Sequence, residues 1–331
     1  MATMEDIARA LGVSKGTVSK ALSGADDVSE ATRKIVLEKA VELGYARLTR
    51  RRDGQRVCIF TRNMPCARPE DFGYDIVIGF RKMAEPAGFS VDIIQLTMDM
   101  QNHYAYDEYM LLHGYQGALF LGLSLKDKWM QDFKTCRTPT VLYDNHVISN
   151  PVVTYVGVDS GEGMDMAVSC LKALGHEKIG YLSGELGSYI YQQRSRAFFA
   201  ALRQNGLDDR NTVAGYSLYT SECLTFHLPR ILEHGCTAIV CSHDLLAHSV
   251  LLHCRERGIR IPEDLSLIGF DDIPLCRHTT PTLSTIRQDQ TQLGKSTFYA
   301  LTSQINRVPI STLLLHAQMI PRGSVGPAPK R

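Results

Sequence analysis

Residues 3–22 read Thr-Met-Glu-Asp-Ile-Ala-Arg-Ala-Leu-Gly-Val-Ser-Lys-Gly-Thr-Val-Ser-Lys-Ala-Leu, and this stretch predicts two short helices joined by a tight turn. Thr3, with an aspartate three residues later, begins a capping-box pattern, and the apolar residues that follow recur at the spacing of one helical face. Gly12 can supply the turn, and Ser14 can cap the second helix. Ser29 is placed to cap a third helix. We therefore expect a three-helix domain of the helix-turn-helix type.

The second of these helices would begin with small and basic residues. Because Val18, Ala21 and Leu22 form its apolar side, Lys15 and Lys20 are left facing outward. Lysine can donate to O6 and N7 of guanine, while hydroxyls and backbone N–H groups bind phosphates. We therefore expect double-stranded DNA as a partner. The residues expected to contact it are Thr3, Ser14, Lys15, Gly16, Thr17, Ser19, Lys20, Ser29, Thr32, Tyr45, Arg47, Arg50, Arg51 and Arg52.

The same segment resembles the headpiece of the lactose repressor family of transcriptional regulators. The family pattern T-x-x-D-I-A-x-x-A-G-V-S-x-x-T-V-S-R-x-L, continued by V-S-x-x-T-R and L-G-Y, is matched almost throughout, with Leu11 for Ala and Lys20 for Arg. Family members often carry a base-reading side chain where this chain has Gly16, so Lys15 and Lys20 are expected to carry more of the recognition. The helix pattern alone leaves open an ordinary three-helix domain with no nucleic-acid role.

Length and charge fit such a domain followed by a larger body. The 331 residues are too many for one small core. We expect a DNA-binding domain at residues 1–46, a short basic linker at 47–56 and an effector-binding and dimerisation domain at 57–331. Residues 1–56 carry 11 Lys and Arg against 8 Asp and Glu, whereas the remainder carries 25 against 27. The small basic excess therefore lies in the part assigned to DNA.

Cysteine usage and hydropathy predict a cytoplasmic protein. The nine cysteines are scattered singly and form no C-x-x-C pair, which is typical of reduced, mostly buried thiols. The N-terminus predicts a capped helix instead of a charged and then apolar leader, and no uninterrupted apolar stretch approaches 18 residues. We expect neither export nor membrane insertion.

Beyond residue 56, strand-like and helix-like segments alternate, which is typical of parallel α/β layers. The expected strands are 57–61, 91–96, 118–122, 140–143, 178–183, 238–241 and 266–270, and the expected helices are 75–88, 161–174, 192–205 and 245–257. A second set of elements begins near Val156, so the pattern predicts two Rossmann-like lobes. Ligands of such sheets collect at the carboxyl ends of the strands, and we expect an effector in the cleft between the lobes.

Motifs in the body also resemble the lactose repressor family, which shares its fold with periplasmic sugar-binding proteins. Val156-Gly-Val-Asp-Ser-Gly-Glu-Gly matches V-x-x-D-N-x-x-G, and Leu174-Gly-His-Glu-Lys-Ile-Gly-Tyr-Leu-Ser-Gly matches L-G-H-x-x-I-x-x-I-x-G. The run from Gly258 through Gly-Phe-Asp-Asp matches G-x-x-V-P-x-D-I-S-V-x-G-F-D-D. The resemblance implies a small helix-turn-helix domain, two lobes of the periplasmic-binding-protein type and a carbohydrate or carbohydrate derivative as effector.

The resemblance also implies candidate effector contacts. Arg194 opens a match to R-x-x-G-F-x-x-A-L, and Asp271 is the first aspartate of Gly-Phe-Asp-Asp. A guanidinium can bind two oxygens at once, and a carboxylate can accept from adjacent hydroxyls. Asp144 ends the matching strand of the first lobe, and Phe72 stands where the family often places an aromatic at the cleft rim. The alternative for Arg194 is a surface arginine on a helix, and the alternative for Asp271 is a buried aspartate that caps a turn.

One position departs from the family within this set. The family commonly has Asn-Asp where this chain has His243-Asp244. A neutral histidine offers one donor and one acceptor, whereas a charged one offers two donors. The departure therefore predicts an effector that differs from the usual ones or is anionic.

The patterns of catalysis and metal binding are missing from the sequence. Gly294-Lys-Ser lacks the first glycine of a phosphate-binding loop, because position 289 is Asp289. His243, His248 and His253 recur every five residues and cannot share one helix face. We expect no enzyme activity, no cofactor and no metal. Trp129 is expected to pack in a core.

The segment after Tyr45 departs most from the family. Relatives carry a longer hinge with N-x-x-A-R-x-L, whose leucine enters the minor groove, whereas residues 46–56 are shorter and lack the motif. Leu48 is an alternative wedge, but its register differs, and we expect a basic linker on phosphates. One headpiece reads a half-site, so a homodimer on a palindromic operator is expected. We expect a repressor; the rival interpretation is a sugar-binding module with a decayed headpiece.

Overall fold

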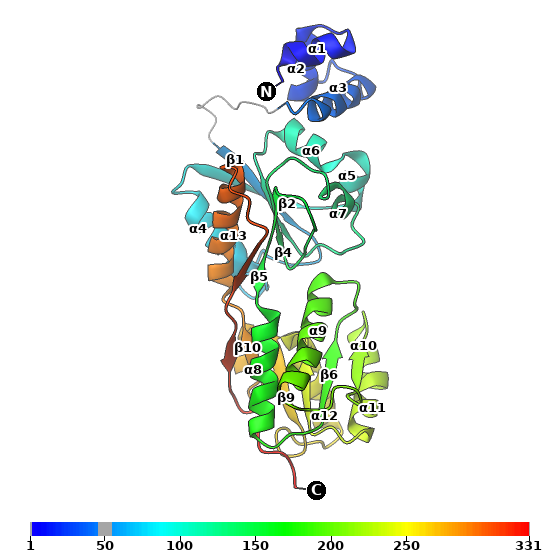
Figure 1. Ribbon diagram of the computed structural model, residues 1–331, viewed down its shortest axis with the longest axis vertical. Helices are drawn as coiled ribbons and strands as arrows, with labels where there is room; N and C mark the ends of the chain where they lie inside the picture. Colours follow the sequence, from blue (N-terminus) through cyan, green and yellow to red (C-terminus); the bar gives the residue numbers. More distant parts are fainter. Residues whose placement is uncertain (1, 46–54, 331) are drawn as a thin grey trace. The chain divides into compact units, whose positions relative to one another are not determined.

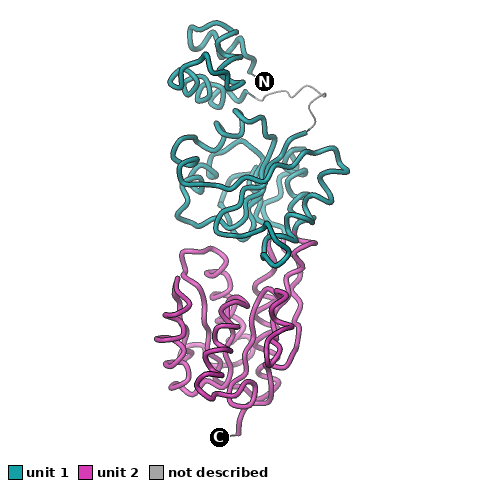
Figure 2. Tube along the Cα trace, turned by 180° about the vertical axis from the view of Figure 1, so that it is seen from behind, with its two compact units in different colours: residues 1–156, 294–313 teal, residues 157–293, 314–331 magenta. Residues whose placement is uncertain are grey.

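The computed structural model describes residues 2–45 and 55–330 of the chain (Figure 1). The chain forms two compact units, which consist of residues 1–156 with 294–313, and of residues 157–293 with 314–331. Figure 2 colours unit 1 teal and unit 2 magenta, and the chain passes between the two units three times. No helix in the described part of the chain combines the length and the apolar character needed to cross a bilayer.

Residues 47–54 of the predicted linker lie outside the described residues, whereas Gln55 and Arg56, also assigned to the linker, begin the first strand, Gln55–Thr61. Residues 46–54 contain Arg47, Leu48 and three further arginines, Arg50, Arg51 and Arg52. The phosphate contacts and the minor-groove wedge considered for them therefore remain predictions from the sequence.

The three predicted headpiece helices are present in unit 1. They are α1, Met4–Leu11, α2, Lys15–Ser23, and α3, Glu30–Glu42. Each begins at its predicted cap, because the hydroxyl oxygens of Thr3, Ser14 and Ser29 accept a hydrogen bond from the backbone N–H three residues later. At Thr3 the capping box is complete, since the aspartate side chain accepts from the Thr3 backbone N–H at 2.9 Å.

The turn between α1 and α2 depends on a glycine. Gly12 has φ of +67°, a left-handed conformation that other residues rarely adopt. The turn lets the two helices share a small core, in which Ile7, Val18, Leu22 and Val36 are at most 2% exposed. The apolar side predicted for α2 is therefore confirmed.

Unit 1 also contains a parallel sheet. Its strands are β1, Gln55–Thr61, β2, Phe89–Gln95, β3, Ala118–Leu121, β4, Thr140–Tyr143, and β5, Val153–Val158, with β11, Thr312–Leu315, at the edge beyond β5. The strand order is β2-β1-β3-β4-β5, the doubly wound arrangement in which ligands bind at the carboxyl edge. The helices around it are α4, Tyr74–Ala84, α5, Met98–His103, α6, Tyr106–His113, α7, Trp129–Asp132, and α13, Gln290–Ile305.

Both faces of this sheet are covered by aromatic packing. On one face Phe60 lies 5.4 Å from Trp129, which is fully buried, so its predicted role in packing is confirmed. Phe80 of α4 and Phe298 of α13 meet at 5.4 Å. Gly294 allows this second contact, because a Cβ there would lie 2.1 Å from a backbone oxygen of α4. The Gly-Lys-Ser stretch thus serves close helix packing.

Unit 2 repeats the same design. Its strands are β6, Ile179–Ser183, β7, Ala214–Tyr216, β8, Ala238–Cys241, β9, Ser266–Asp271, β10, Ser284–Arg287, and β12, Gln318–Ile320. The order is β7-β6-β8-β9-β10-β12, with only β12 antiparallel to its neighbour among the described pairs. The helices are α8, Ser160–Ala173, α9, Tyr189–Gln204, α10, Thr220–Glu222, a π-helical turn, Cys223–His227, α11, Leu228–Glu233, α12, Asp244–Glu256, and a 3-10 turn, Pro274–Arg277.

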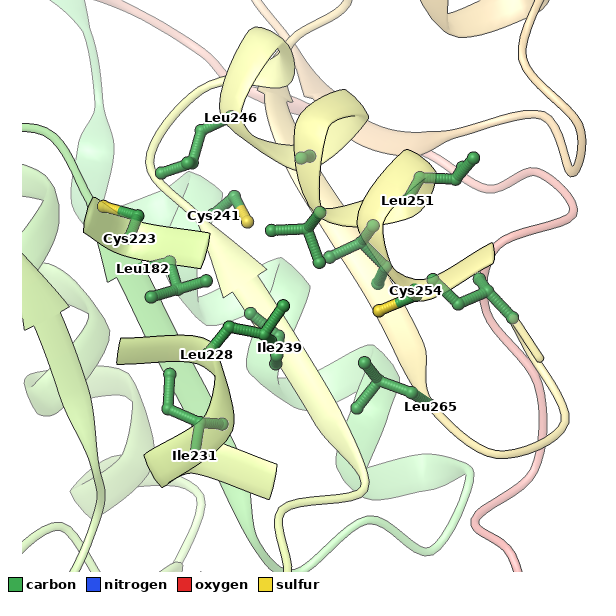
Figure 3. Close-up of a cluster of buried hydrophobic side chains, with 14 of the residues drawn as sticks. Leu182, Cys223, Leu228, Ile231, Ile239, Cys241, Leu246, Leu251, Cys254 and Leu265 are labelled. Carbon is green, nitrogen blue, oxygen red and sulfur yellow. The ribbon is translucent and has the colours of Figure 1, made fainter. Parts of the chain in front are cut away.

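Alternate residues of the unit 2 strands pack on opposite faces. Figure 3 shows Ile239 and Cys241 of β8 in one buried cluster with Leu246 and Leu251 of α12. On the other face Tyr181 of β6 stacks on an α9 phenylalanine at 4.7 Å. A sheet buried on both faces explains why these strands are nearly continuous apolar runs.

The expected elements are largely confirmed, with corrections at their ends. The strands at 140–143 and 238–241 match the prediction residue for residue. The helix expected at 75–88 ends at Ala84, and the left-handed Gly88 turns the chain into β2. The prediction missed the strand β5, the short elements α5, α6, α10, α11, β7, β10, β11 and β12, and the helix α13.

Candidate functional site

The start of α2 differs from the other two helix starts of the headpiece. Within residues 2–45, α1 and α3 have acidic residues in their first turns, whereas α2 has Lys15, Gly16 and Thr17. The N-terminus of a helix carries a partial positive charge and unsatisfied N–H groups. Acidic side chains in the first turn complement this charge from within the protein, whereas a first turn without them leaves the charge available to an external anion. Gly16 is exposed and places no side chain in the way. This helix end suits a DNA phosphate or base edge.

Both candidate lysines are held by exposed carboxylates. Lys15 pairs with Glu5 and Lys20 pairs with Asp27, and the four side chains are 52–61% exposed. These lysines lower the pKa of Glu5 and of Asp27 through their hydrogen bonds. Exposed pairs of this kind contribute little to stability, so DNA can replace the carboxylates at small cost.

The hydroxyl residues predicted to touch DNA lie at helix starts. Ser14 and Thr17 form a hydroxyl pair at 2.9 Å, and Ser29 and Thr32 form one at 2.8 Å. These pairs lie beside the first N–H groups of α2 and α3, where phosphates bind. The remaining members of the set are placed as follows: Thr3 caps α1, Ser19 is exposed on α2, and Tyr45 packs against the headpiece core.

The second candidate site is the carboxyl edge of the unit 2 sheet. The strand order reverses direction between β6 and β8, and Ser242 and His243 follow β8 at this switch point. The neighbouring strand β9 ends at Asp271. The sheet therefore brings two of the predicted effector residues to the same edge.

Arg194 of α9 lies buried at this edge. Its Nη2 is 3.2 Å from Oδ1 of Asp271, and its Nη1 donates to the backbone oxygen of Ser242. The guanidinium carbon lies 3.9 Å from the ring centre of Phe270, a cation–π contact. The side chain is only 4% exposed, which contradicts the alternative of a surface arginine, whereas Arg196 is exposed.

The ion pair and a second donor orient Asp271. Gln288, which follows β10, donates to Oδ1 of Asp271 at 2.6 Å. Burial raises the pKa of Asp271, and the guanidinium of Arg194 acts in the opposite direction. A carboxylate fixed by two donors is suited to accept a further hydrogen bond from a ligand hydroxyl.

His243 is a neutral residue at this edge. Burial and the nearby guanidinium of Arg194 lower the pKa of His243 to about 4. The ring stacks on Tyr191 at 5.5 Å, and its Nδ1 lies 3.0 Å from the Ser242 hydroxyl. A positively charged ring was the reason for considering an anionic effector. Because the ring is neutral, His243 does not support that expectation.

Sequence reasoning missed Asp244, the first residue of α12. It is 1% exposed and accepts hydrogen bonds from Thr285 and from the Ile273 backbone N–H, the latter at 3.0 Å. Burial and the neighbouring Asp271 raise the pKa of Asp244 to about 7. A Cβ at Gly269 would lie 2.2 Å from its carboxylate. The position directly after His243 at a strand end was the signal available in the sequence.

The carboxyl edge of the unit 1 sheet has its own charge pair, also missed from the sequence. Arg62 follows β1, and its Nε lies 2.6 Å from Oδ1 of Asp127, whose side chain is 2% exposed. Asp144 follows β4 at the same edge of the sheet. The ring centres of Phe72 and Tyr143 are 6.4 Å apart. Because Tyr143 directly precedes Asp144, the two predicted effector residues Phe72 and Asp144 are near each other.

Backbone strain marks the two predicted aspartates. Asp144 has φ of +54° and Asp271 has φ of +120°, a region that side chains other than glycine rarely occupy. Such strain persists where the surrounding structure imposes it, and it is concentrated at functional sites. In the described ranges, no group of three or more His, Cys, Asp or Glu side chains is placed to hold a metal ion.

A helix-turn-helix headpiece joined to two doubly wound α/β units, with polar residues at their carboxyl edges, defines a DNA-binding regulator with an effector domain. Residues 3–47 match the bacterial regulatory proteins of the lacI family, and residues 168–325 match the periplasmic binding protein-like domain. The chain thus carries a lacI-family headpiece and a periplasmic-binding-protein-like domain, and it is a DNA-binding transcriptional regulator under ligand control.

Similar proteins match nearly the whole chain. The HTH-type transcriptional repressor CytR of Escherichia coli (strain K12) is 28% identical over 338 residues, which cover 99% of this chain and 97% of the relative. The CelR–cellobiose complex matches with a TM-score of 0.68 at 23% identity, covering 98% of this chain and all of that one. The Lac repressor dimer bound to operator and the anti-inducer ONPF matches with a TM-score of 0.65 at 22% identity, covering 98% and 99%. The last two likenesses concern the fold.

Proposed function

We propose that the chain is a transcriptional repressor that binds a palindromic operator as a homodimer and responds to a carbohydrate-like effector. The observation that carries the proposal is the joint presence in one chain of a helix start with Lys15 and no acidic residue, and a sheet edge with Arg194 and Asp271. The first is a site for DNA, and the second is a site for hydroxyl groups.

The names of similar proteins support each part of the proposal. CytR is named as a repressor, and one solved structure is titled as a dimer bound to operator. CelR is titled as a complex with cellobiose. A single headpiece covers only a half-site, so two copies on a two-fold axis suit a palindrome.

The proposed contacts follow the sequence prediction. In the headpiece Lys15 and Lys20 reach base edges, and the hydroxyls at the starts of α2 and α3 bind phosphates, with the linker arginines extending the phosphate contacts. In the effector domain Asp271, His243 and Arg194 serve the ligand in unit 2, and Phe72 and Asp144 serve it in unit 1. The similar proteins are regulators, and we propose that this chain likewise performs no catalysis.

The rival interpretation, a sugar-binding module with a decayed headpiece, is not favoured. All three headpiece caps and the buried headpiece core are intact. A decayed DNA-binding domain would be free to lose the exposed lysines of α2 and to acquire acidic residues in the first turn of that helix.

A mobility-shift assay with genomic fragments upstream of the chain's own gene tests the proposal. We expect wild type to shift a specific fragment and Lys20→Ala to shift it much less. Lys82→Ala removes the same charge from α4, outside the headpiece, and serves as the matched control. Failure of the folded wild-type protein to select any fragment over random DNA would contradict the proposal.

A further inference from the structure

The headpiece packs against a helix from the larger part of unit 1. Leu111 and Leu112 of α6 are partly buried against the headpiece core. Leu112 reaches the end of α2, because a Cβ at Gly24 would lie 3.8 Å from its Cδ1. A contact of 2.8 Å between His103 of α5 and Glu30 adds a second point at the start of α3. Side chains that follow the linker in the sequence therefore complete the headpiece core.

One arginine reaches the other end of α3. Nη1 of Arg137 donates to the backbone oxygen of Val41, in the last turn of that helix, at 2.8 Å. The last carbonyl groups of a helix carry a partial negative charge, so a guanidinium is favourable there. Gly44 leaves room for this contact, because it has φ of +69° and a Cβ there would lie 2.9 Å from the same nitrogen.

Asp107 of α6 holds the loop that carries Arg137. Its carboxylate accepts from the backbone N–H of Arg137 at 2.9 Å and from the hydroxyl of Thr138 at 2.6 Å. Beside this contact lies a cavity of about 370 Å³, and Arg137 is the one basic side chain among the described residues that line it. The acidic side chains that line it are Glu38, Glu42, Asp107, Glu108 and Asp132. Without the guanidinium, carboxylates on α3 would face carboxylates on the other side of the cavity.

The packed headpiece keeps its DNA-facing residues exposed. The side chains of Lys15 and Lys20 are 61% and 57% exposed. Helix α6 meets α2 at its end, beside Gly24, whereas Lys15 and the first N–H groups lie at its start. The contact with α6 therefore orients the headpiece and leaves its DNA-binding face open.

This contact bears on the segment that departs most from the family. Residues 46–56 are shorter than the usual hinge and lack N-x-x-A-R-x-L. Two headpieces that bind both half-sites at once need a fixed separation, and ordering them during binding costs affinity. Contacts at both ends of α3 supply that order before DNA binds.

We infer that α6 and Arg137 dock the headpiece of the same chain in an orientation ready for DNA, in place of the hinge helix whose motif residues 46–56 lack. This inference rests on the proposed function. Two docked headpieces read the two half-sites as rigid parts, so operator affinity depends strictly on the number of base pairs between the half-sites.

The tumbling of the headpiece in the full chain tests the docking without DNA. Amide NMR relaxation distinguishes the two states, because a docked headpiece tumbles with the whole protein and gives broad signals, whereas a released one gives sharp signals. We expect broad signals from residues 3–45 of wild type, and sharp ones in the double variant Leu112→Gln, Arg137→Gln. Sharp headpiece signals in wild type would overturn the inference.

Operators with altered spacing test the consequence for DNA binding. The fragment selected in the mobility-shift assay is compared with one that has two extra base pairs at its centre, about a fifth of a helical turn. We expect this insertion to weaken wild-type binding at least about 100-fold and binding of the double variant less than about 10-fold. Arg210→Gln and Leu314→Gln make the same changes at exposed positions of unit 2 and should keep the wild-type penalty. An equal penalty for wild type and the double variant would contradict the docking.

Lengthening the linker separates docking from a hinge helix. The sequence Gly-Ser-Gly-Ser, inserted between Asp53 and Gly54, leaves α6, Arg137 and α3 unchanged. We expect the spacing penalty to stay within about 3-fold of wild type, because each doubling of a loop costs little. If the insert relaxes the penalty as much as the double variant does, the linker orients the headpiece and the inference fails.

Failure of the inference and failure of the proposed function give different results. Wild type that selects a specific fragment but tolerates altered spacing contradicts only the docking. Wild type that selects no fragment over random DNA contradicts the proposed function, and the NMR measurement still decides whether the headpiece is docked. A single unfolding transition close to that of wild type shows that the double variant is folded.

Discussion

The headpiece and the unit 2 sheet edge both pair a basic side chain with an aspartate, but they bury the pair to different degrees. Lys20 and Asp27 are 57% and 56% exposed, whereas Arg194 and Asp271 are 4% and 14% exposed. An exposed pair costs little to break, and a buried pair costs several kcal/mol. Burial therefore decides whether a cation is available to an incoming anion or is held in place within the protein.

The largest expected effect comes from breaking the buried pair. We predict that Arg194→Ala lowers the free energy of unfolding by about 3–5 kcal/mol, because Asp271 is left buried without its partner. The folded fraction should bind operator normally and lose the effector response. Urea unfolding and mobility shifts measure the two effects. Arg196→Ala, on the exposed side of the same helix, should change stability by less than about 0.5 kcal/mol.

The next effect concerns the pH dependence of the buried site. Between pH 4 and 6.5 the unfolded chain binds a proton on His243 that the folded chain excludes, so this residue makes stability rise with pH. Between 3.8 and about 7 the folded chain holds a proton on Asp244 that the unfolded chain loses, so this residue makes stability fall with pH. The two contributions oppose each other.

Substitutions should separate these contributions. We predict that His243→Asn makes the slope of unfolding free energy against pH more negative by up to about 1.4 kcal/mol per pH unit between pH 4.5 and 6. Asp244→Asn should shift the slope by a similar amount in the positive direction. His278→Asn, at an exposed position, serves as the control. Parallel slopes for all four proteins would show that neither group titrates as described.

A smaller effect is expected at the exposed pair of the headpiece. We predict that Lys20→Ala weakens binding to the specific operator by about 1–3 kcal/mol and weakens binding to random DNA much less, because a base contact is lost. Fluorescence anisotropy at fixed salt measures both. Equal losses on the two DNAs would assign Lys20 to a phosphate instead of a base.

The headpiece could be predicted from the sequence because its signals are local. Thr3, Ser14 and Ser29 cap their helices through contacts three residues away, and the turn at Gly12 needs only one left-handed residue. The longer body strands could be found from their apolar runs. Short elements such as β7 and β10 were missed, because sheet pairing over long sequence distances stabilises them.

The candidate site could be predicted only in part. Asp271 was identified by its motif, and its position at a strand end followed from the fold. The Arg194–Asp271 pair and the neutral state of His243 could not be predicted, because both depend on burial created by α9, β8 and β9 together. The charge of an effector site is a tertiary property and is not encoded in any one stretch.

The most direct test makes one charge change in each region and measures operator affinity without effector. We predict that Asp27→Asn tightens binding by about 3-fold, because it frees Lys20 and removes a negative charge that repels DNA. Folded Asp271→Asn should bind operator with wild-type affinity, because its partner is buried in the effector domain. If Asp271→Asn tightens binding as much as Asp27→Asn, or if Asp27→Asn has no effect, exposure does not decide which cations meet DNA.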